Sequence, residues 1–97
     1  MNVPRILSVR ALENKKLLVK FVNGTEKVYD CGPLLRLERF RLLGNEAFFK
    51  AVSVDPGGYG ISWNDEMDLS EYELWTNGVA AEVALASSQK DLLGGSL

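Results

Sequence analysis

One short stretch constrains the fold of this chain more than any other: residues 17–30, which read LLVKFVNGTEKVYD. Asn23 and Gly24 lie between two runs rich in Val, Phe and Tyr, a pattern typical of a β-hairpin with a two-residue turn and positive φ at both turn positions. That register places Lys20 opposite Lys27, and like charges facing each other across two strands are unfavourable. A bulged loop avoids this repulsion. The sequence therefore predicts a hairpin and leaves its register open.

Further elements lie on either side of this hairpin. Residues 6–12 carry the apolar positions of a first strand, which completes a three-strand meander. Pro33 suits the first position of a helix, where its missing N–H has no intrahelical partner. After an interruption at Gly44, residues 46–50 predict another helical turn, with Phe48 or Phe49 inward. Residues 51–63 then read as two short strands around a turn-rich Asp-Pro-Gly-Gly cluster.

Residues 61–78 read ISWNDEMDLSEYELWTNG and combine an acidic cluster with a helix start. Ser70 and Glu73 have the spacing of a capping box, in which each side chain bonds the backbone N–H of the other residue. A helix over residues 71–76 accounts for much of the cluster, because carboxylates are stabilised near a helix N-terminus. The alternative is a weak Ca²⁺ or Mg²⁺ site made by three carboxylates, those of Asp65, Glu66 and Asp68.

Four pieces of the chain carry a family resemblance: PRILSVRAL, LLVKFVNGTEKVYDCGPLL, FFKAVSVD and ISWNDEMDLSEYELWTNG. The last is the most specific, with an I-x-W strand at residues 61–63 followed by D-L-S-x-x-x-L at residues 68–74. Over residues 3–78 the chain resembles the small bacterial family catalogued as domain of unknown function 2442. Trp63 is usually followed by proline in that family, so Asn64 is a departure that bears on the local turn.

The resemblance implies an α+β fold, a small antiparallel sheet (three-strand meander, then a hairpin) with short helices packed on it. It implies no catalytic residues, since the family has none assigned. Some relatives are encoded beside another small protein in an arrangement like a toxin–antitoxin pair. The resemblance therefore implies a protein partner more readily than a substrate.

Length and composition set the domain organisation. The 97 residues and the 46% apolar fraction suit one globular domain, which we place at residues 1–78. Residues 79–97 form a C-terminal tail, either a docked short helix or a frayed terminus. We find no secretory signal and no apolar run long enough to span a membrane. With one cysteine, Cys31, the sequence predicts a cytoplasmic protein without membrane contact.

The residue types present argue against several classes of site. The chain has no histidine, which removes the commonest general base and the commonest transition-metal ligand. The glycines around Tyr59 precede a strand, so a hairpin turn is favoured over a phosphate-binding loop. Cys31 suits burial as a small apolar side chain better than a role as nucleophile. We therefore expect no enzyme, with no catalytic, cofactor-binding or metal-binding residues and no cofactor.

Charge is divided unevenly along the chain. Residues 1–50 contain ten Lys/Arg and five Asp/Glu, whereas residues 51–97 contain one Lys/Arg and eight Asp/Glu. The two halves either neutralise each other in the fold or mark binding surfaces of opposite sign. The positions that we expect to contact a partner are the three arginines of the predicted helical region and two aromatic residues of the last helix: Arg36, Arg39, Arg41, Tyr72 and Trp75.

These observations favour a non-catalytic protein-interaction module that binds a protein partner or self-associates, with a toxin–antitoxin-like partnership as one form of that role. The alternative is a regulator that contacts nucleic acid, alone or within a complex; the pI of 5.1 argues against general DNA affinity. An enzyme that works through carboxylates is the least favoured function.

Overall fold

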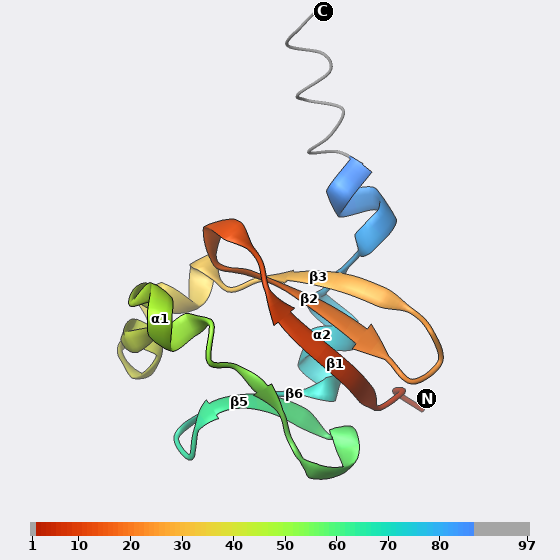
Figure 1. Ribbon diagram of the computed structural model, residues 1–97, viewed down its shortest axis with the longest axis horizontal. Coiled ribbons are helices and arrows are strands. Elements are labelled where there is room, and N and C mark those ends of the chain that lie inside the picture. Colours follow the sequence, from red (N-terminus) through yellow and green to blue (C-terminus); the bar gives the residue numbers. More distant parts are fainter. Residues whose placement is uncertain (1, 87–97) are drawn as a thin grey trace, which may run out of the picture.

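The structure, a computed structural model, describes residues 2–86 and contains two antiparallel sheets. Figure 1 shows the three long strands of the larger sheet, with the β5–β6 hairpin on one side of it. The strands of the larger sheet are, in order across it, β1 (Ile6–Ala11), β2 (Lys16–Phe21), β3 (Glu26–Asp30) and β7 (Val79–Ala80). Those of the smaller sheet are β4 (Ser53–Val54), β5 (Gly60–Asn64) and β6 (Met67–Ser70). The predicted α+β class, with a meander followed by a hairpin, is confirmed.

The β2–β3 hairpin that the sequence predicts is present, and the register that the sequence leaves open is that of a three-residue loop. The Phe21 N–H donates to the Thr25 carbonyl at 2.8 Å, and the Gly24 N–H donates to the Phe21 carbonyl at 2.9 Å. Only Gly24 in this loop has positive φ, at +91°. The extra loop residue places Lys20 opposite Glu26 and Val19 opposite Lys27. The register that the structure adopts thus replaces a repulsive lysine pair with an attractive cross-strand pair.

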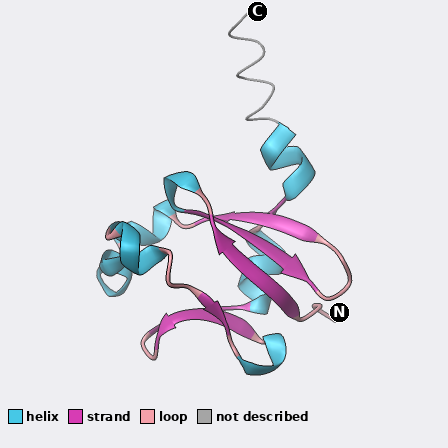
Figure 2. Ribbon diagram, in the orientation of Figure 1, coloured by secondary structure: helices cyan, strands magenta, loops and turns pink. Residues whose placement is uncertain are grey.

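Three short 3-10 or α-helices cover one end of the sheets: η2 (Gly32–Arg36), η3 (Glu38–Gly44) and α1 (Glu46–Phe49) (Figure 2). They are not one continuous helix, because Leu37 has extended backbone (φ −90°, ψ 130°) between η2 and η3. Leu37 is consequently exposed, whereas Phe40 and Leu43 are buried. Asn45 caps α1 by accepting the Phe48 N–H at 3.0 Å. The predicted turn over residues 46–50 is confirmed, with Phe49 as its buried aromatic residue.

Helix α2 (Glu71–Asn77) begins where the sequence predicts. The Ser70 hydroxyl oxygen accepts the Glu73 N–H at 3.1 Å, which is one of the two bonds of a capping box. The Glu73 carboxylate is directed elsewhere: it accepts the Tyr29 hydroxyl at 2.8 Å and the Asn77 side-chain amide at 2.9 Å. Glu73 therefore ties α2 to β3 instead of closing the cap.

The two faces of the larger sheet have different surroundings. One face, here called the inner face, carries the fully buried Leu17, Val19 and Phe21, which share a core with Ile61 and Leu74 of the smaller sheet and α2. The opposite, outer face carries the alternate residues of the same strands: Ser8 and Arg10 of β1, Lys16, Leu18 and Lys20 of β2, and Glu26, Val28 and Asp30 of β3. The core thus lies on one side of the larger sheet.

The structure continues past the domain boundary that we predict at Gly78. Val79 pairs with Val28 and Ala80 with Lys27, so β7 extends the larger sheet by one strand. Residues 81–86 are helical, and Figure 1 shows this helix projecting from the sheet on the side away from the β5–β6 hairpin. The division at residue 78 stays a prediction, and residues 87–97 of the predicted tail lie outside the described residues.

Candidate functional site

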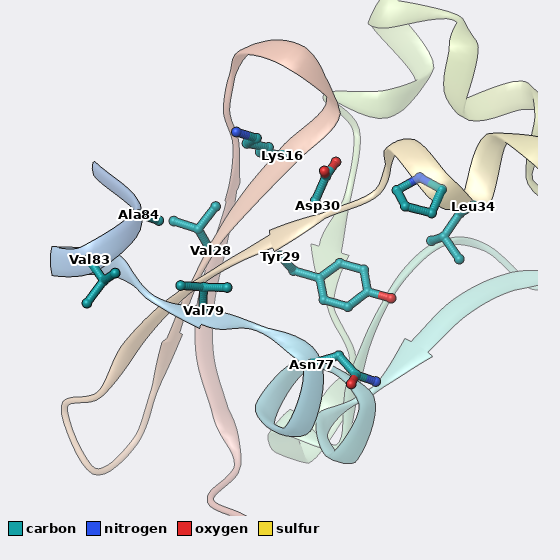
Figure 3. A pocket seen from close by; sticks show the side chains of 10 residues that line it. Lys16, Val28, Tyr29, Asp30, Leu34, Asn77, Val79, Val83 and Ala84 are labelled. Carbon is teal, nitrogen blue, oxygen red and sulfur yellow. The ribbon is translucent and has the colours of Figure 1, made fainter. Parts of the chain in front are cut away.

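A groove of about 670 Å³ lies where β3 and β7 meet the 81–86 helix and the start of η2. Figure 3 shows the side chains that surround it. Ten residues from six segments line the groove: Lys16, Val28, Tyr29, Asp30, Pro33, Leu34, Asn77, Val79, Val83 and Ala84. We take this groove as the candidate site because it is the largest of the hollows described among residues 2–86.

Apolar side chains form one wall of the groove. Val28 and Val79 face each other across the β3–β7 pair, and Val83 lies beside them in the 81–86 helix (Figure 3). Val28 is buried, but Val79 and Val83 are 50% and 58% exposed. Pro33 and Leu34 of η2 form the facing wall. The groove therefore presents apolar surface that the described part of the chain leaves half uncovered, a common property of binding grooves.

Polar groups mark the rim and the end of the groove. Lys16 and Asp30 lie opposite each other on β2 and β3, and the Asp30 carboxylate also accepts the Gly32 N–H at 2.8 Å. At the other end, Tyr29 and Asn77 both donate to Glu73. Burial and the neighbouring Glu73 carboxylate raise the pKa of Tyr29 above its ordinary value, so its hydroxyl stays protonated and acts as a donor. These groups suit hydrogen bonding and orientation of a bound segment.

The three predicted arginines lie in a different part of the molecule. Arg36 ends η2, Arg39 and Arg41 belong to η3, and all three are exposed. The Arg39 guanidinium carbon lies 4.9 Å from the centre of the Phe40 ring. Arg39 also lines a shallow hollow together with Asp68 and Glu73. Its immediate surroundings therefore include carboxylates, which weaken its field toward an anionic ligand.

Tyr72 and Trp75, the predicted aromatic pair of α2, are placed differently although they are three residues apart. Tyr72 is 62% exposed. Trp75 is partly buried, with its ring edge-on to Phe21 at 5.0 Å between centroids. The Lys27 ammonium lies 4.2 Å from the centre of the Trp75 ring and donates to the Trp75 carbonyl. Only Tyr72 of this pair thus lies mainly in solvent.

The acidic stretch after β5 forms a hairpin turn. Asp65, Glu66 and Asp68 are exposed, and the Asn64 side chain accepts the N–H groups of Glu66 and Met67, both at 2.9 Å. Asn64, where the resemblance implies proline, therefore caps this turn with its own amide oxygen. Among residues 2–86 no three His, Cys, Asp or Glu side chains gather closely enough to hold a metal ion.

Cys31 and Trp63 both lie in the core, as expected for a small apolar side chain and a large aromatic one. Cys31 is fully buried, and burial, with a smaller effect from Asp30, raises the pKa of its thiol to about 12. A thiol in that state is a poor nucleophile. Trp63 donates its indole N–H to the Phe49 carbonyl at 2.9 Å and stacks on the Phe49 ring.

One charged contact was not expected from the sequence. Lys15 forms an ion pair with Glu46, thirty-one residues away, and its ammonium lies 5.1 Å from the centre of the Phe49 ring. The hydrogen bond from Lys15 holds the pKa of Glu46 below its usual range. Asn14 and Lys15 both have left-handed backbone, with φ of 61° and 60°. The only signal in the sequence is the Asn before Lys15, since Asn tolerates this conformation.

The groove could not be predicted from the sequence, because the residues that line it are far apart in the chain. The one partial signal was the i,i+4 spacing of Val79 and Val83, which predicts a helix in this region. The structure uses Val79 in a strand and Val83 in a helix, so both point to the same groove for a different reason.

Comparisons with known proteins place the chain in a family. No helix within residues 2–86 is long and apolar enough to cross a membrane. Searches of curated proteins and of solved structures returned no match. A family model described as "Protein of unknown function (DUF2442)" matches residues 6–80, from the first residue of β1 to the last residue of β7. The chain therefore belongs to the DUF2442 family, as its motifs indicate.

Proposed function

We propose that this chain is a non-catalytic protein-interaction module whose groove binds an apolar segment of a protein partner. The observation that carries the proposal is the wall of Val79 and Val83, both about half exposed beside the buried Val28. An exposed apolar surface of this kind, rimmed by polar groups, is typical of interaction sites. The toxin–antitoxin-like partnership implied by the resemblance is one form of this role.

The chemistry of the lining residues agrees with binding more than with catalysis. Lys16 and Asp30 lie opposite each other and offset each other's charge, while Asn77 and the protonated Tyr29 are neutral side chains that donate to Glu73. A groove with little net charge favours an uncharged segment over a phosphate or a carboxylate. Asp65 and Glu66 of the acidic cluster are exposed at the β5–β6 turn, whereas catalytic carboxylates usually lie in a cleft.

Photo-crosslinking from the groove tests the proposal. A photoreactive amino acid replaces Val79 in one variant and Val22 in a control; Val22 is of the same type and 58% exposed in the β2–β3 loop. We expect irradiation in the native cells to join one protein to position 79 and to leave position 22 unjoined. Val79→Glu should then reduce capture of that protein at least tenfold, and Val22→Glu should not. Identical products from both positions would refute the proposal.

The exposed arginines support a second candidate, a contact with nucleic acid. Arg36, Arg39 and Arg41 all lie on the consecutive helices η2 and η3. Fluorescence anisotropy with labelled single- and double-stranded oligonucleotides tests it. The candidate requires binding that weakens steeply with salt and that is lost in the triple Arg→Gln variant. No binding at low salt would eliminate it.

A further inference from the structure

The outer face of the larger sheet carries a second arrangement, whose charged residues do not line the groove. Across β1, β2 and β3 one row of facing residues reads Ser8, Lys20 and Glu26. The adjacent row reads Arg10, Leu18, Val28 and, on β7, Val79. In these two rows the cations, Lys20 and Arg10, lie on β2 and β1, and the positions on β3 and β7 are acidic or apolar. The outer face is therefore divided across its strands into halves of different character.

The cationic half consists of Arg10 and Lys20, both exposed. The acidic half consists of Glu26 and Glu82, which are also exposed and line a common shallow hollow between the β2–β3 loop and the start of the 81–86 helix. Within residues 2–86 the one ion pair is Lys15–Glu46. None of these four charges lies within 4 Å of an opposite charge in the described part of the chain, and Lys20 and Glu26, which face each other across β2 and β3, partly offset each other.

Apolar side chains lie between and beside these charges. The 81–86 helix stands over Val28, as Figure 3 shows for Ala84, and this explains why Val28 is buried on the outer face. The helix leaves Leu18 of β2 only half covered. Its own Val83 and Leu85 are exposed. The β1–β2 half of the face is thus not covered by the helix, and the β3–β7 half is covered by a helix whose own Val83 and Leu85 are exposed.

A two-fold axis parallel to the strands brings these halves together. Such a rotation, with two outer faces opposed, places β2 of each copy over β3 of the other and keeps the rows aligned. Because the 81–86 helix of each copy stands over its own β3, the two helices lie between the sheets. Each helix, with its exposed Glu82, then lies toward the uncovered β1–β2 half of the other copy, where Arg10 and Lys20 are exposed. Two-fold contacts require this kind of self-complementary surface.

We propose that a second copy of this chain binds the outer face, with the Arg10–Lys20 half of each copy against the Glu26–Glu82 half of the other. The inference rests on the proposed function in one respect, since self-association is a protein interaction. It concerns charges outside the groove, so the two proposals are tested by different residues. Each contact occurs twice, which gives the charge pattern a double effect on the dimer.

Two charge-reversal variants test the dimer. Arg10→Glu with Lys20→Glu makes both halves acidic, and Glu26→Lys with Glu82→Lys makes both halves basic. Sedimentation equilibrium should show a wild-type dimer that weakens with salt, and at least a tenfold weaker dimer for each variant alone. An equimolar mixture of the two should restore association, because each copy then meets opposite charge at both contacts.

Matched reversals away from the outer face serve as controls. Arg36→Glu with Arg41→Glu makes the same charge change as the first variant, and Asp65→Lys with Glu66→Lys the same as the second. All four residues are exposed on η2, η3 or the β5–β6 turn. We expect both controls to dimerise like the wild-type chain, and their mixture to gain nothing.

A wild-type chain that is monomeric at its solubility limit would overturn the inference, as would equal dimer affinity in the outer-face variants and the controls. If the chain is monomeric while position 79 still crosslinks one other protein, only the second copy is refuted. If it dimerises while positions 79 and 22 crosslink alike, only the groove's role fails. The two failures are therefore distinguishable.

Discussion

The inner and outer faces of the larger sheet are built from neighbouring residues of the same strands, yet one face is buried in the core and the other is partly exposed to solvent. On β2, Leu17, Val19 and Phe21 are completely buried on the inner face, while Lys16, Leu18 and Lys20 alternate with them on the outer face. Burial on the inner side provides most of the stability of a small domain. The outer side is consequently free to carry charge and half-exposed apolar groups, which is where both proposed contacts lie.

The largest expected effect separates the faces directly, through two adjacent leucines. Leu17→Ala removes a fully buried side chain and should lower the free energy of unfolding by about 2–5 kcal/mol. Leu18→Ala removes a half-buried one and should cost about 1 kcal/mol. Urea unfolding of both variants measures the difference. Equal losses would mean that the outer face is as deeply packed as the inner one.

Two glycines extend the comparison to the turns. Gly58 has φ of +77°, and a Cβ there would lie 2.5 Å from the Ile6 carbonyl oxygen, where the β4–β5 turn packs on β1. Gly24 has φ of +91° with open space around it in the β2–β3 loop. Gly58→Ala should cost roughly 3 kcal/mol, from backbone strain and the clash together. Gly24→Ala should cost about 1–2 kcal/mol from strain alone. Thermal unfolding that ranks Gly24→Ala as the more damaging change would contradict this assignment.

Local rules sufficed to predict much of the fold. The Asn-Gly pair predicts the β2–β3 hairpin because it needs only neighbouring residues, and Ser70 predicts the start of α2 for the same reason. The loop length was harder to predict, since it decides whether Lys20 faces Lys27 or Glu26. Repulsion between Lys20 and Lys27 argues against a two-residue loop, and the structure agrees, because Lys20 faces Glu26. Local spacing did not predict the break at Leu37. This residue follows Leu34 at helical spacing, yet its backbone is extended.

The candidate site was much less predictable, because it depends on contacts between distant segments. The alternating pattern of β3 predicts a strand with one exposed face, which would include Val28. The groove beside Val28 forms only because Val79 pairs with it and the 81–86 helix follows. Trp75 is one of the positions predicted to contact a partner, and in the structure its ring packs against Phe21 and Lys27 of the larger sheet. Glu73 has the spacing of a capping box, but its carboxylate accepts the Tyr29 hydroxyl instead of the backbone N–H of Ser70.

The contact between β3 and α2 provides a medium-sized test on the inner side. Tyr29→Phe removes the hydroxyl that donates to Glu73 at 2.8 Å. Because the acceptor is a carboxylate, the loss should be about 1–2 kcal/mol. Tyr72→Phe is the matched control, since its ring is mainly exposed on the same helix, and it should change little. Chemical denaturation of the two variants gives the comparison; similar stabilities would show that the Tyr29–Glu73 bond contributes nothing net.

The smallest expected effect concerns pH and the buried thiol behind β3. Burial raises the pKa of Cys31 from an ordinary value of 9.0 to about 12, so the folded chain keeps its thiol where the unfolded chain forms a thiolate. Stability from this group is complete below pH 9 and is lost progressively as the pH rises toward 12.

Near pH 10 the loss from Cys31 should be about 1 kcal/mol relative to neutral pH. Tyr29, whose pKa is also raised, adds a loss of the same sign at higher pH. Cys31→Ala isolates the thiol, because it keeps Tyr29 while removing the group that ionises. We expect urea midpoints of the wild-type chain to fall more steeply between neutral pH and about pH 10 than those of Cys31→Ala. Parallel curves would mean that the thiol ionises as readily in the folded chain as in the unfolded one, and that the inner face admits water at Cys31.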